Sequence, residues 1–534
     1  MSEAISTRDA AGALDAAARL LDRAVRNARG REIDDQQVAV ARLADLATEH
    51  RSALDLLSYA EGAGEGHAPL AVSWAGQVVS RIGRLVDDHA ADHGLTPEDA
   101  LDRREREFAR GACAEPRLRE IGQGVARDRG RNESPLGETL EQVRASVREF
   151  ADGEVAPSAE AIHRRDLLVP ESFIEQMSAL GYFGLSIDEA YGGTALGHVA
   201  MCITTEELSR ASLAAAGSLI TRPEILAKAL LAGGTEEQKR TWLPRIASGE
   251  AMVAVGVTEP DIGSDVASVK CRAEPARVGG REGWAIDGPK AWCTFAGRAD
   301  IIALLARTDP DPALGARGLS LFIVPKPRFD GREFEYRQPG GGRIVGKADA
   351  TPGYRGLHSF SLNFERYFVP ADHLIGEEGG RGRGFYLQMG GFAAGRLQTG
   401  ARATGLAQAA LERTSEYVLD RSQFGRPLID FQLTQYRLGW MATRVAAARA
   451  ITYAAAEAMD RDARAAAPYA AQAKLLACDT AVDVTQAGQL LHGGWGYAEE
   501  YPISRYVVDA QVLPIFEGVK PTLQLKVVGR ALLA

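Results

Sequence analysis

The chain has 534 residues and a formal net charge of −9, with 62 basic and 71 acidic side chains mixed along its length. This length exceeds one ordinary hydrophobic core, so several domains are expected, and the charge balance argues against nucleic acid as the main partner. The five cysteines are widely spaced, in neither a disulfide framework nor a metal-ligand pattern, which is typical of free thiols in a reducing compartment. No apolar stretch reaches the length of a membrane span, and charges interrupt the apolar runs at the N-terminus, so we expect a cytoplasmic protein with no membrane contact and no metal site.

Residues 1–133 are predicted to form a helical extension. In its first predicted helix, apolar side chains recur at helical spacing, at Leu14, Ala18, Leu21 and Val25. The stretch from Thr96 to Asp99 has the N-cap residue, early proline and acidic first turn of a helix start, and Gly111 is a candidate helix end. The polar stretch from 127 to 135 ends in Ser-Pro and predicts a linker. The extension carries no cluster of catalytic side chains.

The extension also contains a weak repeat of the C-terminal region. With Asp35 aligned to Asp430, six of fourteen successive positions are identical. The identical pairs are Asp35 and Asp430, Gln37 and Gln432, Arg42 and Arg437, Leu43 and Leu438, Ala47 and Ala442, and Thr48 and Thr443. Two alanine-rich helices can coincide by composition, so two interpretations stand: chance, or a degenerate copy of one helix that packs as a helix itself.

After the linker, the hydrophobic pattern changes twice. Residues 134–250 show helical patterning, with a capping box that begins at Thr235. Residues 251–372 contain apolar or alternating runs bounded by Gly, Pro and Asp, which predicts a β domain, and residues 373–534 return to long alanine-rich helices. The predicted strands are VAVGV (253–257), GWAID (283–287), IIALLA (301–306), LSLFIVP (319–325) and FSLNFERYFVP (360–370). This order of elements predicts an α+β protein.

Two stretches of the predicted β domain combine polar donors with an aromatic ring. In the first, from Val255 to Asp265, an apolar run leads into a turn with two hydroxyls, a proline and a glycine, so backbone N–H groups and hydroxyls can point at one polar edge of a ligand. In the second, Trp292 and Thr294 share one face if the segment is extended. The alternative for either stretch alone is a strand, a turn and a strand with a core tryptophan. Together they favour a cradle for a flat heteroaromatic ring.

These two stretches resemble the acyl-CoA dehydrogenase family of flavoproteins, in which Thr-Glu-Pro-x-x-Gly-Ser-Asp and Lys-x-Trp-x-Thr surround the isoalloxazine of FAD. The resemblance covers about residues 136–534. It implies an N-terminal helical domain, a central β-barrel or sheet domain and a C-terminal four-helix bundle, here preceded by the extension, with FAD as the cofactor. The residues that it places at the flavin are Val255, Val257, Thr258, Gly263, Ser264, Trp292 and Thr294, and Ser264 is also expected at the substrate.

Two further stretches resemble family motifs for the diphosphate and adenosine half of FAD. Arg421, Phe424 and Gln432 match a motif whose arginine and glutamine reach the FAD of a neighbouring subunit, and guanidinium groups suit phosphate oxygens because they bind them bidentately. The alternative is a charged helix end followed by a turn. Gly493 and Gly494 match a glycine-rich loop whose backbone N–H groups approach the pyrophosphate. Because a neighbour's FAD requires a neighbour, we expect a homodimer or a homotetramer.

The candidate catalytic base is Glu517, which follows Phe516 and precedes Gly518. Burial among apolar side chains is expected to raise the pKa of this carboxyl and make it a better proton acceptor. An ordinary glutamate at a helix start is the alternative. In the family, an aromatic-Glu-Gly motif supplies the base that removes the pro-R α-proton of an acyl-CoA while the β-hydride passes to the flavin. The resemblance therefore implies Glu517 as the catalytic residue and Gly518 beside the substrate.

Other positions near the base agree with the family or depart from it. Some members carry the base on an internal helix before an arginine, but that position is Gly395 here, so Glu517 remains the candidate. The following residue, Arg396, is expected at the substrate, with a surface arginine as the alternative. Leu490 stands where the family commonly has a glutamine, and Val519 where it has a threonine. The resemblance therefore assigns no FAD contact to these two positions.

Arg222 bears on the identity of the substrate. It precedes a proline where many family members carry uncharged residues that face the acyl tail, and a cation there is costly unless it meets an anion such as a second carboxylate of the substrate. A solvent-facing arginine, or one paired with Glu224, is the alternative. The chain resembles family members that oxidise (2S)-methylsuccinyl-CoA to mesaconyl-CoA in the ethylmalonyl-CoA pathway. The resemblance rests on Arg222, the extension and the stretches 353–358, 396–402 and 501–505.

Three other functions remain open at this point. Within the family, the chain is alternatively a dehydrogenase of another short or branched acyl-CoA, or an oxidase that passes electrons to oxygen. A redox-silent flavoprotein associated with nucleic acid is an alternative of another class, but its expected basic patch is missing. For a dehydrogenase, the resemblance implies electron-transferring flavoprotein as the electron acceptor.

Overall fold

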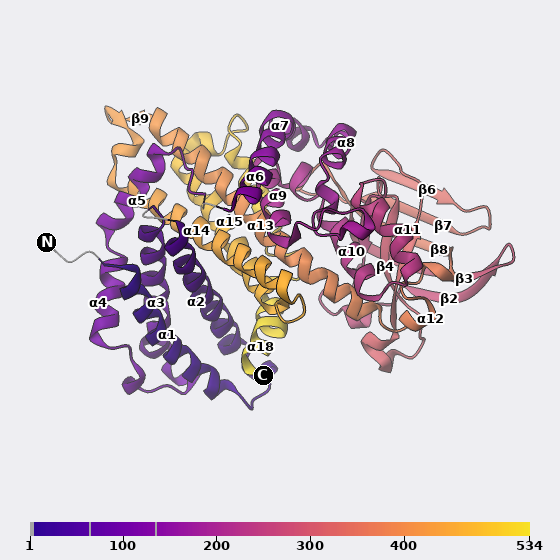
Figure 1. Cartoon of the computed structure of the whole chain (residues 1–534), viewed down its shortest axis with the longest axis horizontal. Helices are drawn as coiled ribbons and strands as arrows, with labels where there is room; N and C mark the ends of the chain where they lie inside the picture. The colour runs from indigo at the N-terminus through magenta and orange to yellow at the C-terminus, as the bar shows by residue number, and fades with distance from the viewer. Residues whose placement is uncertain (1–4, 64–65, 134–135) are drawn as a thin grey trace. The chain divides into compact units, whose positions relative to one another are not determined.

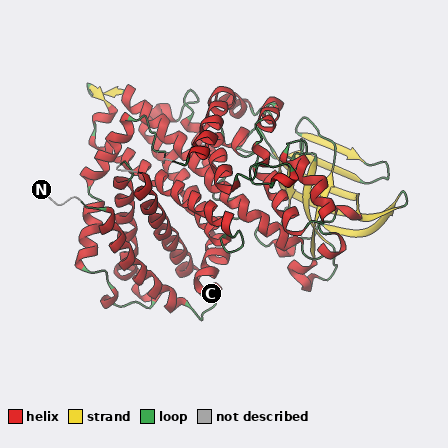
Figure 2. Ribbon diagram, viewed as in Figure 1, coloured by secondary structure: helices red, strands yellow, loops and turns green. Residues whose placement is uncertain are grey.

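The structure, a computed structural model, describes residues 5–63, 66–133 and 136–534. It divides into two compact units, and each is described here by itself. Unit 1 comprises residues 1–145 and 399–534, and unit 2 comprises residues 146–398. In the described part of unit 1, the regular elements are helices and one short hairpin, whereas unit 2 combines helices with a large sheet (Figure 2). The predicted α+β class is confirmed.

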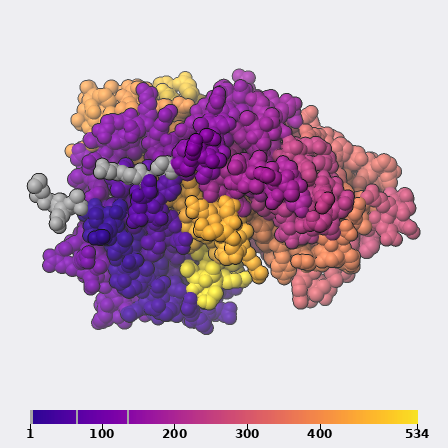
Figure 3. All heavy atoms as spheres, viewed as in Figure 1, coloured from indigo at the N-terminus to yellow at the C-terminus, as the bar shows by residue number. Residues whose placement is uncertain are grey.

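Unit 1 joins the two ends of the chain. The extension contributes α1 (Thr7–Ala28), α2 (Gln37–Ala63), α3 (Ala68–His93), α4 (Arg103–Ala112) and α5 (Glu115–Arg127). The C-terminal part contributes the second half of α13 (Gly384–Asp420), the hairpin of β9 (Ser422–Gln423) and β10 (Arg426–Pro427), α14 (Gln432–Arg461), α15 (Ala467–His492), α16 (Ile503–Ala510), α17 (Lys520–Thr522) and α18 (Arg530–Leu533). Figure 3 shows the indigo and purple surface of the extension beside the orange and yellow surface of the C-terminal part, and α5 and α2 pack against α14.

The helix predictions in the extension hold in part. The first helix is confirmed as α1, which buries Leu14, Leu21 and Val25. The cap predicted at Thr96 is confirmed, since Thr96 and Asp99 form a capping box with Pro97 at the start, but the helix that it opens is only a 3-10 turn of residues 97–99, because Ala100 with ψ 145° leaves the helical conformation. Gly111 does not end the next helix, which continues to Ala112.

The predicted linker packs tightly within unit 1. Its residues Ser134 and Pro135 lie outside the described residues, but Asn132 is buried and donates its amide N–H to the Ala442 carbonyl at 3.1 Å. Arg449 in turn donates to the backbone and side-chain oxygens of Asn132 at 3.2 Å each. These bonds fix the end of the extension on α14, and they explain why a polar segment is ordered.

The repeat in the sequence has a structural counterpart. A 3-10 turn ends at Asp35 before α2 and at Asp430 before α14, and the two helices begin at the matching residues Gln37 and Gln432. The paired threonines Thr48 and Thr443 each donate to the carbonyl four residues earlier, at 2.7 and 2.8 Å. Matching starts and matching side-chain bonds are what a degenerate copy predicts, and α2 packs as a helix on α14.

A buried carboxylate sits among the helices of unit 1. Glu49 of α2 pairs with Arg81 of α3, and Arg444 of α14 adds to its electrostatic environment. Burial outweighs both cations and raises the pKa of Glu49 to about 7. The native state therefore holds a proton at this site that the unfolded chain gives up near the ordinary glutamate pKa.

The Glu49 proton makes stability depend on pH. Between pH 4.5 and 7 the native state binds more protons than the unfolded state, so the contribution of Glu49 is present at low pH and is lost as the pH rises through about 7. Relative to Glu49→Gln, the wild-type protein is expected to lose on the order of 2 kcal/mol between pH 5 and pH 8. Thermal unfolding midpoints at both pH values measure this, with Glu61→Gln on the exposed end of α2 as the control. A constant difference between wild type and Glu49→Gln would contradict it.

Unit 2 combines several helices with one sheet. The helices are the end of α6 (Glu138–Phe150), α7 (Ala156–Arg165), α8 (Glu171–Ala179), α9 (Gly197–Ala211), α10 (Thr221–Gly233), α11 (Glu236–Ala247), α12 (Glu377–Gly380) and the first half of α13 (Figure 1). The capping box predicted at Thr235 is confirmed, since its hydroxyl accepts from the Gln238 N–H at 3.3 Å. No helix among the described residues combines the length and apolarity needed to cross a bilayer.

Eight described strands form the sheet. They are β1 (Val253–Gly256), β2 (Arg272–Val278), β3 (Arg281–Thr294), β4 (Ile301–Arg307), β5 (Leu319–Pro325), β6 (Glu333–Arg337), β7 (Arg343–Ala348) and β8 (Ser359–Pro370). Their order is β1-β4-β2-β3-β8-β7-β6, with β5 paired to β4. The five predicted strands are confirmed as β1, β3, β4, β5 and β8. The sequence analysis missed β2, β6 and β7, whose exposed polar side chains interrupt the apolar pattern.

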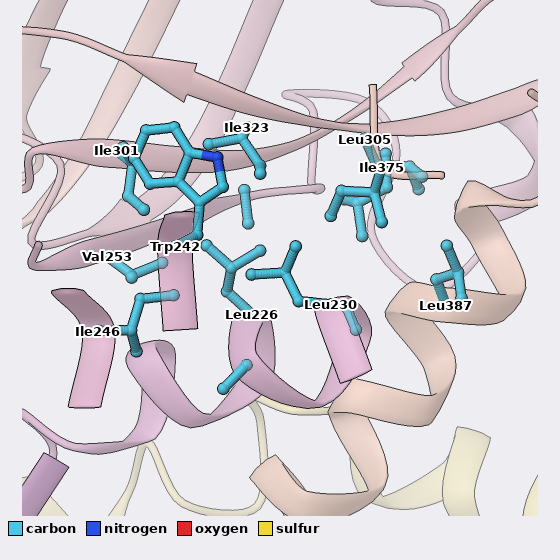
Figure 4. Packing of buried hydrophobic residues seen from close by; sticks show 14 of the residues in the cluster. Leu226, Leu230, Trp242, Ile246, Val253, Ile301, Leu305, Ile323, Ile375 and Leu387 are labelled. Carbon is cyan, nitrogen blue, oxygen red and sulfur yellow. The ribbon is translucent and has the colours of Figure 1, made fainter. Parts of the chain in front are cut away.

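Helices α10 and α11 cover one face of this sheet and form the core of unit 2. Figure 4 shows Leu226, Leu230, Trp242 and Ile246 of the helices against Val253, Ile301, Leu305 and Ile323 of the strands. Because β1 and α10 share this core, the turn that follows β1 and the first turn of α10 are both held by rigid elements.

Candidate active site

The structure brings the two predicted flavin stretches together in unit 2. The Ala291 N–H, in β3, donates to the Thr258 carbonyl, just after β1, at 2.8 Å. The Lys290 ammonium donates to the Val257 carbonyl and to the Glu259 carboxylate, both at 3.0 Å. Both side chains of this ion pair are buried, so the two stretches are fixed to each other.

The sequence analysis missed Glu259 as the organiser of this region. Its carboxylate also accepts the backbone N–H groups of Lys270 and Cys271, at 2.9 and 2.8 Å. The backbone of Glu259 pairs with Ile262 in both directions, which closes the turn between them. The available signal was an acidic residue in the first motif and a basic residue in the second, because a buried glutamate requires a partner.

Trp292 differs from both sequence expectations. Its φ is +59° and a bulge interrupts the pairing of β3 with β8 between Lys290 and Cys293, so the segment is not regularly extended and the expected shared face with Thr294 does not follow. Trp292 is 59% exposed, which also excludes the core tryptophan. Thr294 is buried and its hydroxyl lies 2.8 Å from that of Ser359. An exposed indole on a strained backbone is typical of a ligand-stacking position.

The other flavin candidates of unit 2 lie in β1 and in the turn that follows it. Val255 lies in β1 and is half-buried, and Val257 is buried. Gly263 and Ser264 lie at the exposed tip of the turn, and a Cβ at Gly263 would meet no other atom within 4 Å. An open turn beside an exposed indole leaves room for a planar ring and its polar edge, so these residues fit the isoalloxazine of FAD.

Arg222 lies in the first turn of α10, buried with 6% of its surface exposed. It donates to the Ser218 carbonyl at 2.8 Å and to the Tyr354 hydroxyl at 3.1 Å. These neutral partners take two of its five N–H donors. Among the described residues of unit 2, no carboxylate pairs with it, so both alternatives for Arg222 are wrong: it neither faces solvent nor pairs with Glu224.

Glu224 has its own partners. The Ser186 hydroxyl donates to its carboxylate, the Lys228 ammonium lies 3.5 Å away, and His198 lies at 3.9 Å. The partners of this carboxylate among the described residues are therefore Ser186, Lys228 and His198, and not Arg222. The guanidinium of Arg222 keeps a positive charge in a buried position without a counter-ion from the described part of unit 2.

Tyr354 is a site residue that the sequence analysis did not single out. It lies in the loop between β7 and β8 with φ +57°, a left-handed conformation that an aromatic residue rarely adopts. The loop is anchored to the segment that follows α7: the Val169 N–H donates to the Gly356 carbonyl at 2.9 Å, and His358 lies 3.0 Å from Asp166. The anchored loop holds the Tyr354 hydroxyl against Arg222. Arg396, the other substrate candidate of unit 2, is half-buried in α13.

In unit 1, the candidate base lies in a loop held from several sides. The loop runs from α16 to α17, and Glu517 adopts φ +55°. Lys474 donates to the Gly518 carbonyl at 2.5 Å, the Cys478 thiol donates to the Leu513 carbonyl at 3.3 Å, and the Arg402 guanidinium lies 4.6 Å from the Phe516 ring centre. A left-handed glutamate costs about 1–3 kcal/mol and persists only when its surroundings fix it. Such strain is typical of functional positions.

The FAD motif at residues 421–432 forms an exposed hairpin. Phe424 and Gly425 are its two turn residues, both with positive φ, and Phe424 is 94% exposed. Arg421 and Gln432 flank the hairpin and are also exposed. The alternative of a charged helix end followed by a turn describes the local structure correctly, but it leaves a fully exposed aromatic ring unexplained.

The glycine-rich loop follows α15. A Cβ at Gly493 or Gly494 would meet nothing within 4 Å, so the backbone of this loop is open to a ligand. Gln489 donates to the Gly496 carbonyl at 3.1 Å and so closes the loop, whereas Leu490, at the position of the usual glutamine, is 80% exposed. The Gly493 N–H donates to the Leu490 carbonyl, and the missing side chains of Gly493 and Gly494 leave room for a pyrophosphate to approach the loop.

Three family models match the chain. They describe the acyl-CoA dehydrogenase N-terminal domain at residues 137–250, the middle domain at 254–367 and the C-terminal domain at 382–533. Among curated relatives, (2S)-methylsuccinyl-CoA dehydrogenase of Cereibacter sphaeroides is 41% identical over 75% of this chain and 70% of its own length. Among solved structures, butyryl-CoA dehydrogenase from Megasphaera elsdenii is similar with a TM-score of 0.68 and 30% identity, over 76% of this chain and all of the other.

A second solved structure, of glutaryl-coenzyme A dehydrogenase in a glutaryl-CoA complex, is similar with a TM-score of 0.65 and 28% identity, over 76% of this chain and 98% of the other. The three models together span the chain from residue 137 almost to its end, in the order helical, β and helical that the structure has. The chain belongs to the acyl-CoA dehydrogenase family, and is thus a FAD flavoprotein and an oxidoreductase that acts on acyl-CoA.

Proposed function

We propose that the enzyme oxidises a short branched acyl-CoA that carries a second carboxylate, namely (2S)-methylsuccinyl-CoA, to the α,β-unsaturated mesaconyl-CoA. The observation that carries this proposal is Arg222, a buried cation whose partners in unit 2 are neutral oxygens. Burial of an uncompensated charge is costly, and the free carboxylate of such a substrate would remove that cost. The similarity to a methylsuccinyl-CoA dehydrogenase supports the same substrate.

In this proposal Glu517 removes the α-proton of the thioester. Its strained, anchored loop fixes the carboxylate, which supports transfer of the proton over a short distance. The backbone N–H of Glu517 donates to the thioester carbonyl and stabilises the negative charge that develops there, with Gly518 beside it. FAD, when bound, accepts the β-hydride.

Arg222 fixes the other end of the substrate. Its guanidinium binds the free carboxylate, while the Tyr354 hydroxyl and the Ser218 carbonyl hold the guanidinium in one orientation. Arg396 and Ser264 complete the substrate contacts. A monocarboxylic acyl-CoA of the same length leaves Arg222 uncompensated, so selection acts against it.

The remaining roles concern FAD and the partners. Trp292 stacks on the isoalloxazine, and the backbone and hydroxyls of the turn after β1 bind its polar edge. Val255, Val257, Thr258, Gly263, Ser264 and Thr294 complete this set. Arg421, Phe424, Gln432, Gly493 and Gly494 bind the diphosphate and adenosine half, the first three from a second copy of the chain, in a homodimer or a homotetramer. Electron-transferring flavoprotein takes the electrons in the cytoplasm.

Anaerobic bleaching of the flavin tests the proposal. Purified holoenzyme is mixed with (2S)-methylsuccinyl-CoA, butyryl-CoA or isovaleryl-CoA, and the visible absorbance of the flavin is followed. We expect fast bleaching by methylsuccinyl-CoA and rate constants at least about tenfold lower for the two monocarboxylates, since a buried charged hydrogen bond is worth more than 1.4 kcal/mol. Preference for a monocarboxylate would overturn the dicarboxylate substrate, and no bleaching by any of the three would overturn the dehydrogenase function proposed here. If oxygen reoxidises the reduced flavin at least as fast as the substrate reduces it, the enzyme is an oxidase.

A further inference from the structure

The segment that follows the base begins close to it. Three residues after Glu517, Lys520 opens a continuous helical segment, residues 520–533, which comprises α17, a π-helical stretch and α18. The Lys520 N–H donates to the Pro514 carbonyl at 3.0 Å, so the segment is tied to the loop on both sides of the base. A Cβ at Gly518 would lie 2.9 Å from the Leu523 side chain. The place of the base therefore depends on where residues 520–533 are held.

Helix α2 of the extension holds this segment through Asp45. One Asp45 oxygen accepts from the Gln524 amide at 2.8 Å, and the other lies 3.9 Å from the Lys520 ammonium. Lys520 also pairs with Asp479 of α15 at 2.6 Å. The first residue of the segment thus lies between a carboxylate of the C-terminal part and a carboxylate of the extension.

Apolar packing makes the same connection. Five buried residues form a cluster between α2, α15 and residues 520–533, namely Ala44, Ala471, Leu475, Leu523 and Val528. Val40 of α2 packs so closely on Gly529 that a Cβ there would lie 2.4 Å from a Val40 methyl group. The π-helical stretch of residues 523–529 packs on α2, and α18, which lies at the C-terminal end of the chain in Figure 1, packs on α1.

We infer that the N-terminal extension sets the position of the catalytic base, with Asp45 as the positioning residue. This inference rests on the proposed role of Glu517. Asp45 acts through Lys520 and Gln524: it fixes residues 520–533, and these fix the carboxyl side of the loop that carries Glu517 in its left-handed conformation. Its loss lets the loop relax, which moves the carboxylate away from the α-carbon without a change in substrate or FAD binding.

Single-turnover reduction of the flavin in Asp45→Ala tests this. The holoenzyme is mixed anaerobically with (2S)-methylsuccinyl-CoA, or with butyryl-CoA if only this reduces the flavin, each with hydrogen or deuterium at the α-carbon. We expect the rate constant of reduction to fall about tenfold, because a small misplacement of a reacting group is enough for this. The deuterium isotope effect should rise, since proton removal limits the rate more strongly, while the substrate concentration at half-maximal rate and the FAD content stay unchanged.

Two variants separate positioning from folding. Asp34→Ala removes the ion pair between Asp34 and Lys526, 3.1 Å long, which joins the extension to the same segment further from the base. We expect its rate constant within about twofold of wild type, as for an exposed ion pair. If Asp45→Ala does not accumulate as folded holoenzyme, Gln524→Leu removes the 2.8 Å bond alone and is judged by the same criteria.

The outcomes are distinct. A wild-type rate constant and isotope effect in Asp45→Ala would overturn the inference. A smaller bleaching amplitude at the wild-type rate would also overturn it, because the amplitude reports only the fraction of folded enzyme. Equal losses in Asp45→Ala and Asp34→Ala would also overturn it. If Glu517→Gln is inactive while Asp45→Ala is normal, this inference alone fails. If Glu517→Gln is fully active, the proposed base and this inference fail together.

Discussion

Glu517→Gln is expected to lower the rate constant of flavin reduction by about 10²–10⁴-fold, because the substitution removes the general base and keeps the size of the side chain. The amide cannot accept the α-proton, whereas two contacts that hold the loop are made by neighbouring residues: Lys474 donates to the Gly518 carbonyl and Arg402 lies over the Phe516 ring. FAD content and the visible spectrum of the oxidised flavin should therefore match wild type. Stopped-flow mixing with (2S)-methylsuccinyl-CoA measures the loss.

A nearby glutamate serves as the control for this substitution. Glu500 is exposed in the segment between the glycine-rich loop and α16. Glu500→Gln makes the same chemical change and should reduce the flavin at the wild-type rate. A rate constant for Glu517→Gln within tenfold of wild type would show that another group takes the proton. Loss of FAD from Glu517→Gln would show instead that the residue supports the cofactor site.

The sequence predicted those helices and strands whose apolar residues follow a regular spacing. The apolar runs at 301–306 and 319–325 are buried on both faces, and their sequences alone identify β4 and β5. Helix α1 follows from the spacing of Leu14, Leu21 and Val25. Strand β2 was missed because four of its seven residues are exposed, so no apolar alternation marks it.

The contacts that define the candidate site are long-range or depend on backbone geometry, and sequence patterns carry neither. Trp292 was recognised from its motif, but its exposure comes from a bulge that regular strand alternation does not predict. Tyr354 meets Arg222 across 132 positions of the sequence. Asp45 meets Gln524 across 479 positions, in a part of the chain that has no catalytic motif. A local motif can identify a functional residue. The residues that contact it, such as Tyr354 at Arg222 and Asp45 at Gln524, follow only from the packing of distant elements.

Arg222→Met is expected to raise the dissociation constant of (2S)-methylsuccinyl-CoA about 100-fold, because truncation of one partner of a buried charge pair costs about 2–5 kcal/mol. Methionine keeps the length and apolar volume of the arginine stem, so α10 should remain packed. The acyl chain of butyryl-CoA carries no charge for Arg222 to bind, so removal of the cation does not weaken its binding. The dissociation constant of butyryl-CoA should therefore stay within about threefold of wild type or fall. Titration of the oxidised flavin spectrum, or the substrate dependence of bleaching, measures both values.

Tyr354→Phe is a milder perturbation of the Arg222 site. It removes the oxygen that accepts from the Arg222 guanidinium at 3.1 Å and leaves the charge in place. The dissociation constant of methylsuccinyl-CoA should rise about three- to tenfold, the effect of one ordinary hydrogen bond, because Arg222 keeps its charge and its bond to the Ser218 carbonyl, and that of butyryl-CoA should not change. If Arg222→Met weakens both acyl-CoAs equally, the arginine supports the fold of α10 and does not select the substrate. If it affects only the dicarboxylate and Tyr354→Phe shifts the same constant in the same direction, the cation and the tyrosine that orients it together form the carboxylate site.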